Sequence, residues 1–429
     1  MKEQQPKRIL IINQPVNNRG DESAHRALVR MLARQYPQHR IEVLFTLELK
    51  DSIKQFKVDA PNVSYVSFMD DIKNPNLIQK IYRSIVVYRL FNEYLIYAMK
   101  HGKTWMLRLN PITNRIWCKI RRADIILNAP GGICMGGFQN WRHIAFLEMA
   151  RQSGKDTFYY GRSFGPFPTK NKGGIVFKDY SKKLLENFKF LAIRDNKTEQ
   201  LAREMGLKYT MTVDTAFLET PRADLPKEMS EQIGDNYMVF VPNVLRWHYA
   251  FKDIPAKRIH RMFEGMMEVI AHQDEQMKLV MLPQTFNYAN PLQNDVNFFR
   301  ELRDNSPYRE RIVVMDDIYS SDIQQTIISK ARFLVGARYH SAVFAINNDI
   351  PFVALSYEHK IVGLLTTLQA TDCMIDITDL STEEKADEYI GILESRLNNM
   401  SPRPELTQQA KEIAKNCFDK FTHMIDGYE

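Results

Sequence analysis

Short runs of aliphatic, β-branched and aromatic residues alternate along the chain with longer stretches of helical character. The runs lie at residues 8–14, 41–46, 123–130, 156–161 and 190–195, and again at 237–243, 278–284, 311–317, 333–340 and 351–357. Strands that alternate with helices are typical of parallel sheets built from βαβ units. The pattern therefore predicts an α/β protein.

A polar, proline-containing stretch at residues 219–236 separates the two series of runs. The alternation restarts after it, which indicates two Rossmann-like parallel-sheet domains in a chain of 429 residues. We place these domains at residues 1–225 and 226–400. The chain after Thr382 has helical character with a break at 401–404, so we expect a C-terminal helix over 401–429.

The segment 76–122 differs from the rest in composition. It holds ten Lys and Arg residues and one acidic residue, Glu93, so its net charge is +9, whereas the whole chain carries +7. Tyr, Phe and Trp are frequent among these charges. Basic and aromatic residues on helical sequence are typical of a surface for an anionic membrane or a nucleic acid. The alternative is a solvated helical excursion whose aromatic side chains face the core.

The composition excludes several classes of protein. No run approaches the ~18 apolar residues of a membrane span, and the N-terminus resembles a first strand rather than a signal peptide. The four cysteines are scattered, which favours a reducing compartment, and we expect the cytoplasm. No metal-ligand, P-loop or GxSxG motif is found, so we expect neither a metal nor a cofactor.

Unusual residues follow the predicted strands, at the edge where open parallel sheets bind ligands. After the first strand, Gly20 permits a turn with positive φ, and Asp21 or Ser23 is placed to cap a helix that begins near Glu22. Backbone N–H groups at such a helix start suit an anion or a polar sugar. The alternative is that Asp21 is only an N-cap.

Two further stretches combine glycine and arginine. Four of the 18 glycines lie within residues 131–137, and residues 160–167 read YGRSFGPF. They indicate a backbone that approaches either a ligand or a tightly packed neighbouring element. Arg194 ends the run at 190–195 next to Asp195, where it forms either a carboxylate or phosphate site or a plain Arg–Asp pair.

The stretch GARYHSAVFAINNDIPFVALSYEHK at residues 336–360 is the most informative. Arg338 and His340 are two residues apart at the end of one predicted strand, Ser341 is placed to cap the next helix, and Lys360 follows the next strand. Neighbouring parallel strands are ~4.8 Å apart, so these side chains can converge. Two cations and an imidazole at adjacent strand ends favour an anion site over a structural histidine.

Five motifs together resemble the polysaccharide pyruvyl transferase family. They are NNRGDE, PGGICMGG, GRSFGP, AIRD followed by VDTAF, and the stretch from GARYHSAVFA to DIPFVALSYEHKIVGLL, and the likeness covers roughly residues 8 to 370. The last motif, with R-x-H, a helix, a proline that opens a strand and Y-x-x-K, is the most specific. The Gly-rich motif departs from the three consecutive glycines usual in the family, and residues 78–122 match no family feature.

The resemblance implies a fold similar to GT-B glycosyltransferases, with two domains facing a cleft. It implies phosphoenolpyruvate as donor, two hydroxyls of a lipid-linked or nucleotide-linked sugar as acceptor, and a pyruvate ketal in capsular or exopolysaccharide biosynthesis as product. Arg194, Arg338 and Lys360 would bind the donor, and His340 would act as proton donor or binding group. On the acceptor side Asp21 is the candidate base, and the candidate sugar contacts are Asn18, Gly20, Gly131, Gly132 and Trp247.

Alternatives to this function remain at this point. A GT-B-type glycosyltransferase would use a nucleotide sugar, with Glu358 near a place suited to the ribose. A sugar-binding or assembly protein would need neither His340 nor Lys360 for function. Trp247 is either a stacking platform for a sugar or a core residue. For residues 76–122 we expect peripheral contact with an anionic membrane at the inner face, and we expect no nucleic acid as partner.

Overall fold

The computed structural model describes residues 5–14, 18–45, 57–67, 76–82, 85, 89–132, 134–137, 139–167, 172–286 and 294–427. The chain divides into two compact units. Unit 1 comprises residues 1–16, 24–215 and 414–429, and unit 2 comprises residues 17–23 and 216–413. The linear division suggested by the sequence, at residues 225 and 400, stays a prediction, and the units of the structure are used below.

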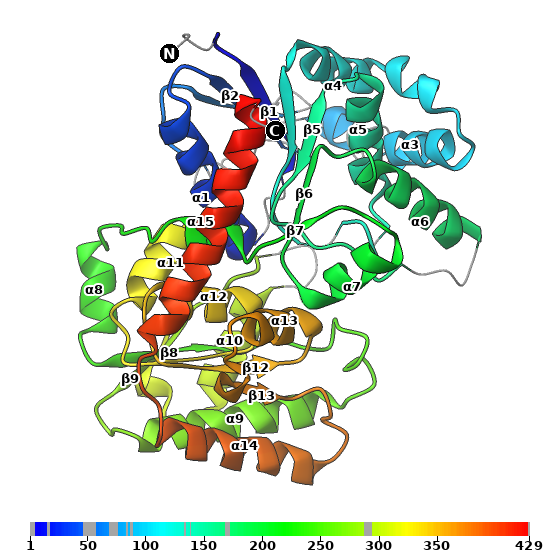
Figure 1. Cartoon of the computed structure of the whole chain (residues 1–429). Helices are drawn as coiled ribbons and strands as arrows, with labels where there is room; N and C mark the ends of the chain where they lie inside the picture. Colours follow the sequence, from blue (N-terminus) through cyan, green and yellow to red (C-terminus); the bar gives the residue numbers. More distant parts are fainter. Residues whose placement is uncertain are drawn as a thin grey trace. The chain divides into compact units, whose positions relative to one another are not determined.

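Unit 1 is built on a parallel sheet (Figure 1). Its described strands follow the order β3-β2-β1-β4-β5-β6-β7. The elements are β1 (Arg8–Gln14), α1 (Arg19–Gln35), β2 (Arg40–Phe45), β3 (Val63–Ser67), α2 (Leu77–Tyr82), α3 (Phe91–Lys100), the 3-10 helix η3 (Thr104–Arg108), α4 (Pro111–Arg122), β4 (Ile125–Asn128), α5 (Trp141–Gln152), β5 (Asp156–Tyr159), α6 (Lys172–Leu185), β6 (Phe190–Ile193), α7 (Asn196–Glu204) and β7 (Thr210–Met211).

The alternation of side chains along β1 divides the core of unit 1 between the two faces of its sheet. Leu10 and Ile12 belong to a buried cluster with side chains of α3, α4, α5 and α6. The other face receives α1 and the end of the last helix, where Phe421 packs edge-on against Phe158 of β5 with ring centroids 5.4 Å apart. Because both faces are covered, the strands are apolar throughout, which is why short continuous runs predicted them.

Unit 2 repeats the same architecture. Its described strands are all parallel in the order β10-β9-β8-β11-β12-β13. The elements are α8 (Lys227–Ile233), β8 (Tyr237–Val241), α9 (Ala256–His272), β9 (Lys278–Met281), α10 (Asp295–Asn305), β10 (Ile312–Val314), α11 (Ser321–Ile328), β11 (Leu334–Gly336), α12 (Tyr339–Asn347), β12 (Phe352–Ser356), α13 (His359–Thr367), β13 (Met374–Asp376), α14 (Glu383–Leu397) and α15 (Pro404–Asp426), whose last part returns to unit 1.

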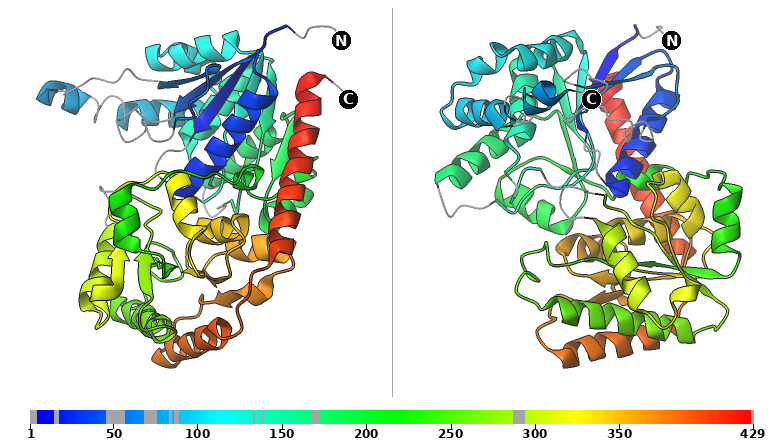
Figure 2. Two further views of the ribbon diagram at one scale, coloured as in Figure 1. Left: turned by 90° about the vertical axis from the view of Figure 1, so that its left-hand side faces the viewer. Right: turned by 180° about the vertical axis from the view of Figure 1, so that it is seen from behind.

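The prediction of two Rossmann-like parallel-sheet domains is confirmed. Each strand expected from the hydrophobic runs is present, and the helical tail is interrupted where expected, between α14 and α15. Figure 2 shows that the excursion before β4 consists of separate short helices rather than one long helix. Arg83 and Tyr88, two of its basic and aromatic residues, lie outside the described residues.

Candidate active site

The strand order identifies one place in each sheet where a ligand is expected. In both units the chain runs outward from a central strand in one direction and then resumes on that strand's other side, between β1 and β4 in unit 1 and between β8 and β11 in unit 2. Open α/β sheets bind ligands at the carboxyl ends of the strands at this reversal. Arg338 follows β11, and the Gly-rich stretch from Gly131 follows β4.

Arg338 is held at the reversal point of unit 2 by a buried carboxylate. It forms an ion pair through its Nη2 with Asp295, the fully buried first residue of α10. The second oxygen of Asp295 accepts hydrogen bonds from the backbone N–H groups of Gln284 and Thr285, each at 3.0 Å. Burial alone would lower the pKa of Arg338, but the charge of Asp295 raises it above its ordinary value. The guanidinium is therefore charged and fixed in orientation.

One N–H group of Arg338 remains available to a ligand. Its Nε is buried and has no hydrogen-bond partner among the described residues. Buried donors without partners are rare in folded proteins because the lost hydrogen bond is costly. The arginine is therefore built like a side chain that completes its hydrogen bonding when an anion binds.

His340 lies in the first turn of α12, where its imidazole packs against Gly20. A β-carbon built on Gly20 would lie 1.8 Å from His340 Nδ1, so only glycine fits beneath the ring. Both residues belong to unit 2, because residues 17–23 associate with that unit. Gly20 itself is helical and has no positive φ, so the turn expected there is wrong. Its function in the fold is to make space for the imidazole.

Three expectations about helix starts and strand ends are wrong. Asn18, rather than Asp21 or Ser23, precedes α1 and accepts a hydrogen bond from the Gly20 N–H at 2.7 Å. Asp21 is a half-buried residue inside the first turn. Ser341 is also inside its helix, and its hydroxyl donates to the backbone oxygen of Arg338 at 2.5 Å. Because β11 ends at Gly336, Arg338 and His340 do not alternate along a strand.

Lys360 lies in the first turn of α13, next to β12, where it pairs with Glu358. Its Nζ is 3.4 Å from the Glu358 carboxylate, and both side chains are mostly buried. Burial would raise the pKa of Glu358, but Lys360 and nearby imidazoles lower it below its ordinary value. The charge of Glu358 also raises the pKa of Arg338, and the convergence of Arg338 and Lys360 on one ligand stays a prediction.

The helices that follow β11 and β12 add two sources of positive potential. Arg338 and Glu358 occupy the N-cap positions of α12 and α13, and neither side chain makes a capping hydrogen bond. Free N–H groups and the helix dipole at such a terminus favour an anion. Two uncapped helix starts thus lie beside the cations at neighbouring strand ends.

Trp247 lies in the loop after β8, on the other side of the reversal point. The indole is half-buried and donates to the Asn243 side chain at 3.0 Å, and its ring meets Tyr357 edge-on at 5.9 Å. Next to it, burial lowers the pKa of His248. Trp247 is thus anchored at its polar end beside the Lys360 region, with part of its ring open to solvent.

The glycines of unit 1 pack around a buried arginine. Arg162 donates to the backbone oxygens of Gly132 at 2.7 Å and Ala129 at 2.9 Å, and Gly131 forms a bridge with it at a φ of 136°. The close backbone approach predicted from the glycines is thus present, and the group approached is a side chain of the protein. The structure does not test a sugar at Gly131 and Gly132.

Arg194 is buried in unit 1 and pairs with Asp214, not with its neighbour Asp195. The Arg194–Asp214 ion pair is almost completely buried, and the arginine Nε also donates to the Ser163 hydroxyl at 3.4 Å. Asp195 instead caps α7 through the Thr198 N–H at 2.9 Å. Asp214 is part of the VDTAF motif, but the sequence alone did not indicate that it pairs with Arg194.

Sequence reasoning missed a polar cluster in the first turn of α1, within unit 2. Arg19 forms a buried ion pair with Glu22 at 2.8 Å, and Glu22 accepts a hydrogen bond from the Ser321 N–H at the start of α11. The i, i+3 spacing of an arginine and a glutamate was the available signal. This cluster holds Gly20, and therefore the contact with His340, in place.

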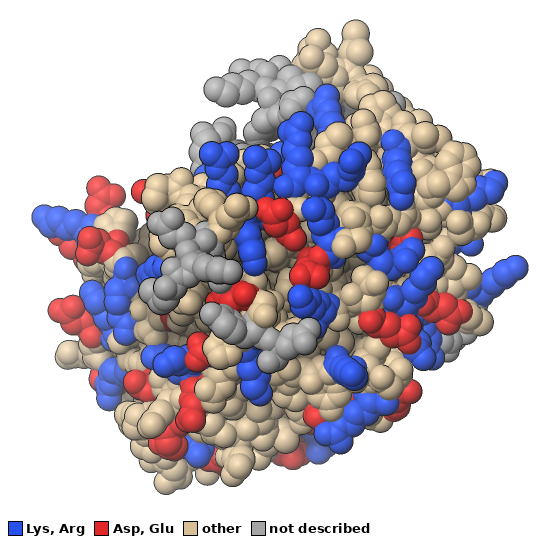
Figure 3. Space-filling model, turned by 45° about the horizontal axis from the view of Figure 1, so that its top comes forward, with Lys and Arg blue, Asp and Glu red and all other residues tan. Residues whose placement is uncertain are grey.

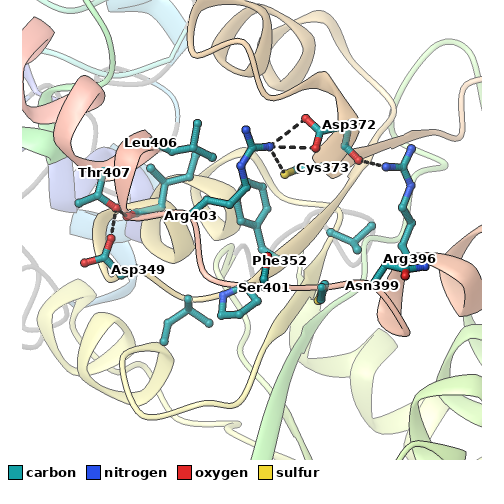
Figure 4. A pocket seen from close by; sticks show the side chains of 15 residues that line it. Asp349, Phe352, Asp372, Cys373, Arg396, Asn399, Ser401, Arg403, Leu406 and Thr407 are labelled. Carbon is teal, nitrogen blue, oxygen red and sulfur yellow. Dashed lines mark hydrogen bonds and ion pairs between the residues drawn. The ribbon is translucent and has the colours of Figure 1, made fainter.

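A separate cavity of about 260 Å³ lies at the amino ends of β12 and β13 (Figure 4). Its charged groups are already paired, since Arg403 bonds to both Asp372 oxygens at 2.9 Å and Arg396 donates to the Asp372 backbone oxygen. Because α/β ligands bind at the opposite edge, we do not place the active site there.

Comparison with known proteins agrees with the geometry. The chain is 21% identical over 417 residues to the amylovoran biosynthesis protein AmsJ of Erwinia amylovora, which covers 90% of this chain and 92% of that protein. In fold it is similar to the UDP-GlcNAc 2-epimerase of Methanocaldococcus jannaschii, with a TM-score of 0.53, 10% identity and coverage of 95% and 99% of the two chains.

It is also similar to the trehalose 6-phosphate synthase of Burkholderia multivorans, with a TM-score of 0.51, 10% identity and coverage of 99% and 98%. These likenesses support the GT-B-like fold. The family model described as polysaccharide pyruvyl transferase matches residues 18–359, a range that includes Arg194, Arg338 and His340. The chain belongs to the polysaccharide pyruvyl transferase family.

Proposed function

We propose that the protein transfers pyruvate from phosphoenolpyruvate to two hydroxyls of a sugar and forms a pyruvate ketal during assembly of a surface polysaccharide. Family membership and the likeness to an amylovoran biosynthesis protein support the pathway. The observation that carries the donor assignment is Arg338, fixed by Asp295 at the reversal point of unit 2 with a buried Nε–H still to be satisfied.

The charge of the donor explains why several positive groups are gathered. Phosphoenolpyruvate carries a carboxylate and a phosphate, and a preorganised site must supply fixed donors to both. The Arg338 guanidinium suits a planar carboxylate, whereas Lys360 and the starts of α12 and α13 suit a phosphate. Since Lys360 pairs with Glu358, the incoming phosphate competes with Glu358 for the ammonium group.

The reaction requires one proton at carbon. Protonation of the enol CH2 makes C2 electrophilic, one sugar hydroxyl attacks C2, the C2–O bond to phosphate breaks, and a second hydroxyl closes the ketal. The two hydroxyl protons balance those taken up by the CH2 group and by the phosphate. We assign delivery of the carbon proton to His340, because an imidazole can donate near neutral pH. No cofactor takes part in this scheme.

The acceptor side is proposed from the residues around Gly20 and from Trp247. Asp21 lies in the same first turn of α1 as Gly20, which touches His340, and Asn18 directly precedes this turn. A base and an amide next to the proton donor are suited to the attacking hydroxyl. Trp247 supplies an aromatic face. We propose a lipid-linked or nucleotide-linked sugar as acceptor and a cytoplasmic reaction, with Arg194 as a further donor contact.

A direct assay tests the donor. Purified protein is incubated with phosphoenolpyruvate and candidate lipid-linked or nucleotide-linked oligosaccharides, and phosphate release and product mass are measured. We expect acceptor-dependent phosphate release and a mass gain equal to pyruvate less water. Release of a nucleotide from a nucleotide sugar, with no consumption of phosphoenolpyruvate, would instead establish a glycosyltransferase.

A further inference from the structure

The excursion between β3 and β4 exposes an unusual amount of apolar side chain. Of the large hydrophobic residues that are exposed in the described part of the chain, all but Ile175 and Tyr249 lie between residues 77 and 109. They include Leu77, Ile78, Trp105 and Leu109, which are 72%, 77%, 59% and 66% exposed. Large exposed apolar side chains that gather in one segment of a chain indicate a place of interaction.

The excursion is nonetheless anchored to unit 1. Phe91, Leu95 and Met99 of α3, Leu107 of η3 and Ile116 of α4 are buried in the core cluster. The expectation that aromatic side chains face the core thus holds for Phe91, whereas Trp105 points outward. Helix α2 has no buried residue, and the left view of Figure 2 shows it standing away from the sheet. The outward side chains are therefore not required by the core.

The same segment carries many exposed basic residues. Among the described residues of the excursion, the exposed cations are Lys80, Arg89, Lys100, Lys103, Arg108, Arg115, Arg121 and Arg122. Lys103 stacks on the exposed ring of Tyr97 at 5.2 Å. A hollow of about 250 Å³ at the end of α4 adds Arg8 and Arg40 beside Lys119 and Arg122. Figure 3 shows Lys and Arg gathered over the surface of unit 1.

We propose that the excursion is a membrane-docking surface, which inserts the side chains of Leu77, Ile78, Trp105 and Leu109 among the lipids of an anionic bilayer. Exposed Leu, Ile, Trp and Tyr beside Lys and Arg are typical of segments that lie in the interface of a membrane. Each Lys or Arg near an anionic surface adds electrostatic attraction. This surface belongs to unit 1, whereas Arg338 and Lys360 belong to unit 2, and its test does not depend on the proposed activity.

The binding partner of this surface is inferred from its two features, the exposed apolar side chains and the positive charge. A second copy of this chain would bring its own segment 76–122, with a net charge of +9, against the same charge, and like charges oppose such an interface. A nucleic acid would use the cations but leave the aliphatic side chains of α2 in water. An anionic bilayer accommodates both. No helix in the part of the chain that the structure describes is long and apolar enough to span a membrane.

Vesicle flotation with the full chain tests the proposal. We expect binding to vesicles of phosphatidylcholine with phosphatidylglycerol, little binding to phosphatidylcholine alone, and weaker binding at high salt. Replacement of Leu77, Ile78, Trp105 and Leu109 by Ser is expected to weaken binding at least about tenfold, because the apolar side chains that would be buried in the bilayer are lost. The control replaces the exposed apolar residues elsewhere, Ile175 and Tyr249, and is expected to bind as wild type.

The basic residues are tested in the same assay. Lys80, Arg89, Arg121 and Arg122 are replaced by Gln, and the control removes four exposed cations of unit 2, namely Lys227, Lys257, Arg309 and Lys330. Only the first set is expected to reduce binding to anionic vesicles. Circular dichroism verifies that every variant is folded.

Three outcomes would overturn the proposal. The first is wild-type protein that fails to float with anionic vesicles. The second is equal binding by the excursion variants and their controls. The third is a wild-type dimer in light scattering that the Ser variant makes monomeric while vesicle binding stays unchanged, which would identify the surface as an interface between copies.

Discussion

The placement of the Arg338 guanidinium depends on Asp295, a residue distant in the sequence. The guanidinium follows β11 and its carboxylate begins α10, 43 residues earlier in the chain. A buried ion pair is strongly destabilised when one partner is removed, since the other charge is left in a medium of low dielectric. Asp295 therefore compensates the buried charge of Arg338 and fixes the orientation of its side chain.

The Asp295→Asn variant tests this dependence. We expect a loss of about 3 kcal/mol in the free energy of unfolding, and a higher KM for phosphoenolpyruvate because Arg338 loses its fixed position. Urea denaturation and steady-state kinetics measure the two effects. The control is Asp387→Asn in the exposed Arg261–Asp387 pair, where a change of less than about 1 kcal/mol is expected. Equal effects in the two variants would contradict the assignment.

Substitutions of the cations and of the imidazole are expected to change different kinetic constants. Arg338→Ala and Lys360→Ala remove groups that bind the donor, so KM for phosphoenolpyruvate should rise with a smaller change in kcat. His340→Ala removes the proposed proton donor, so kcat should fall by about 100-fold or more. If His340→Ala raises only KM, the imidazole is a binding group and not the acid.

Substitution of Gly20 tests whether the position of the imidazole matters, because it displaces the ring without replacing His340. In Gly20→Ala the new methyl group would overlap His340, so the ring must move, and a shift of ~1 Å in a catalytic group can cost about 100-fold in rate. Alanine is favoured over glycine within a helix, so stability is expected to change less than activity. Gly391→Ala in α14, where a methyl group meets nothing within 4 Å, is expected to retain full activity.

The sequence indicated which polar residues follow strands, but it did not indicate which residues pair with them. Arg338, His340 and Lys360 follow strands in the sequence, and strand ends at neighbouring positions of a parallel sheet are close in space. Asp295 could not be paired with Arg338, since nothing in a single sequence relates positions so far apart. Gly20 was noticed for the conformational freedom of glycine, whereas its actual requirement is the space taken by a ring from another element.

At the scale of elements, the apolar runs predicted the central strands and the edge strand β10, but not the other three edge strands. β3, β7 and β13 lie at the sides of their sheets, and their sequences, VSYVS, TM and MID, are short or partly polar. Such segments carry weak periodicity. The run at 333–340 was assigned too long a strand, because no proline or turn residue follows Gly336 to mark the end of β11 before α12 begins at Tyr339.

Helix α1 makes an element-scale prediction about pH. His25 is buried against β2 and β3, with its Nε2 3.2 Å from the Tyr65 hydroxyl and Arg26 and Arg30 nearby. Burial, assisted by these arginines, lowers its pKa from 6.5 to about 3. Below pH 6.5 the unfolded chain binds a proton that the folded chain does not, so stability falls by about 1.4 kcal/mol per pH unit until about pH 3.

His25→Gln removes this contribution. Urea midpoints measured between pH 7 and pH 4 should decline less steeply with falling pH in the variant than in wild type, whatever its stability at pH 7. The same substitution at exposed His272 is the control, and wild-type slope is expected there. A slope unchanged by His25→Gln would mean that His25 takes up its proton in the folded state.

At the scale of the whole molecule, the units are interlaced along the chain, which a linear reading of the sequence could not show. Residues 17–23 associate with unit 2, and residues 414–429 return to unit 1. The polar stretch at 219–236 did indicate where one sheet is complete and another begins. The return of the last helix depends on packing between side chains far apart in the sequence, such as Phe421 and Phe158.

The returning segment is expected to be essential for the stability of unit 1. Phe421 is fully buried and also packs against Tyr160, with ring centroids 5.0 Å apart. Phe421→Ala should lower the free energy of unfolding by about 3–5 kcal/mol. Its exposed neighbour provides the control, because Lys420→Ala should change stability by less than about 0.5 kcal/mol. A small effect of Phe421→Ala would show that unit 1 folds without the segment.

The return of residues 414–427 also bears on how the protein is made. A ribosome delivers the strands of unit 1 first, but the helical segment that covers Phe158 and Tyr160 emerges only after all of unit 2 has been translated. Nascent unit 1 therefore spends most of its synthesis with an apolar face uncovered, and exposed faces of this kind attract chaperones or aggregate. Unit 2 comprises residues 17–23 and 216–413, so all of it has been synthesised before residues 414–427 emerge. We therefore expect the domain that begins first to reach its native state last.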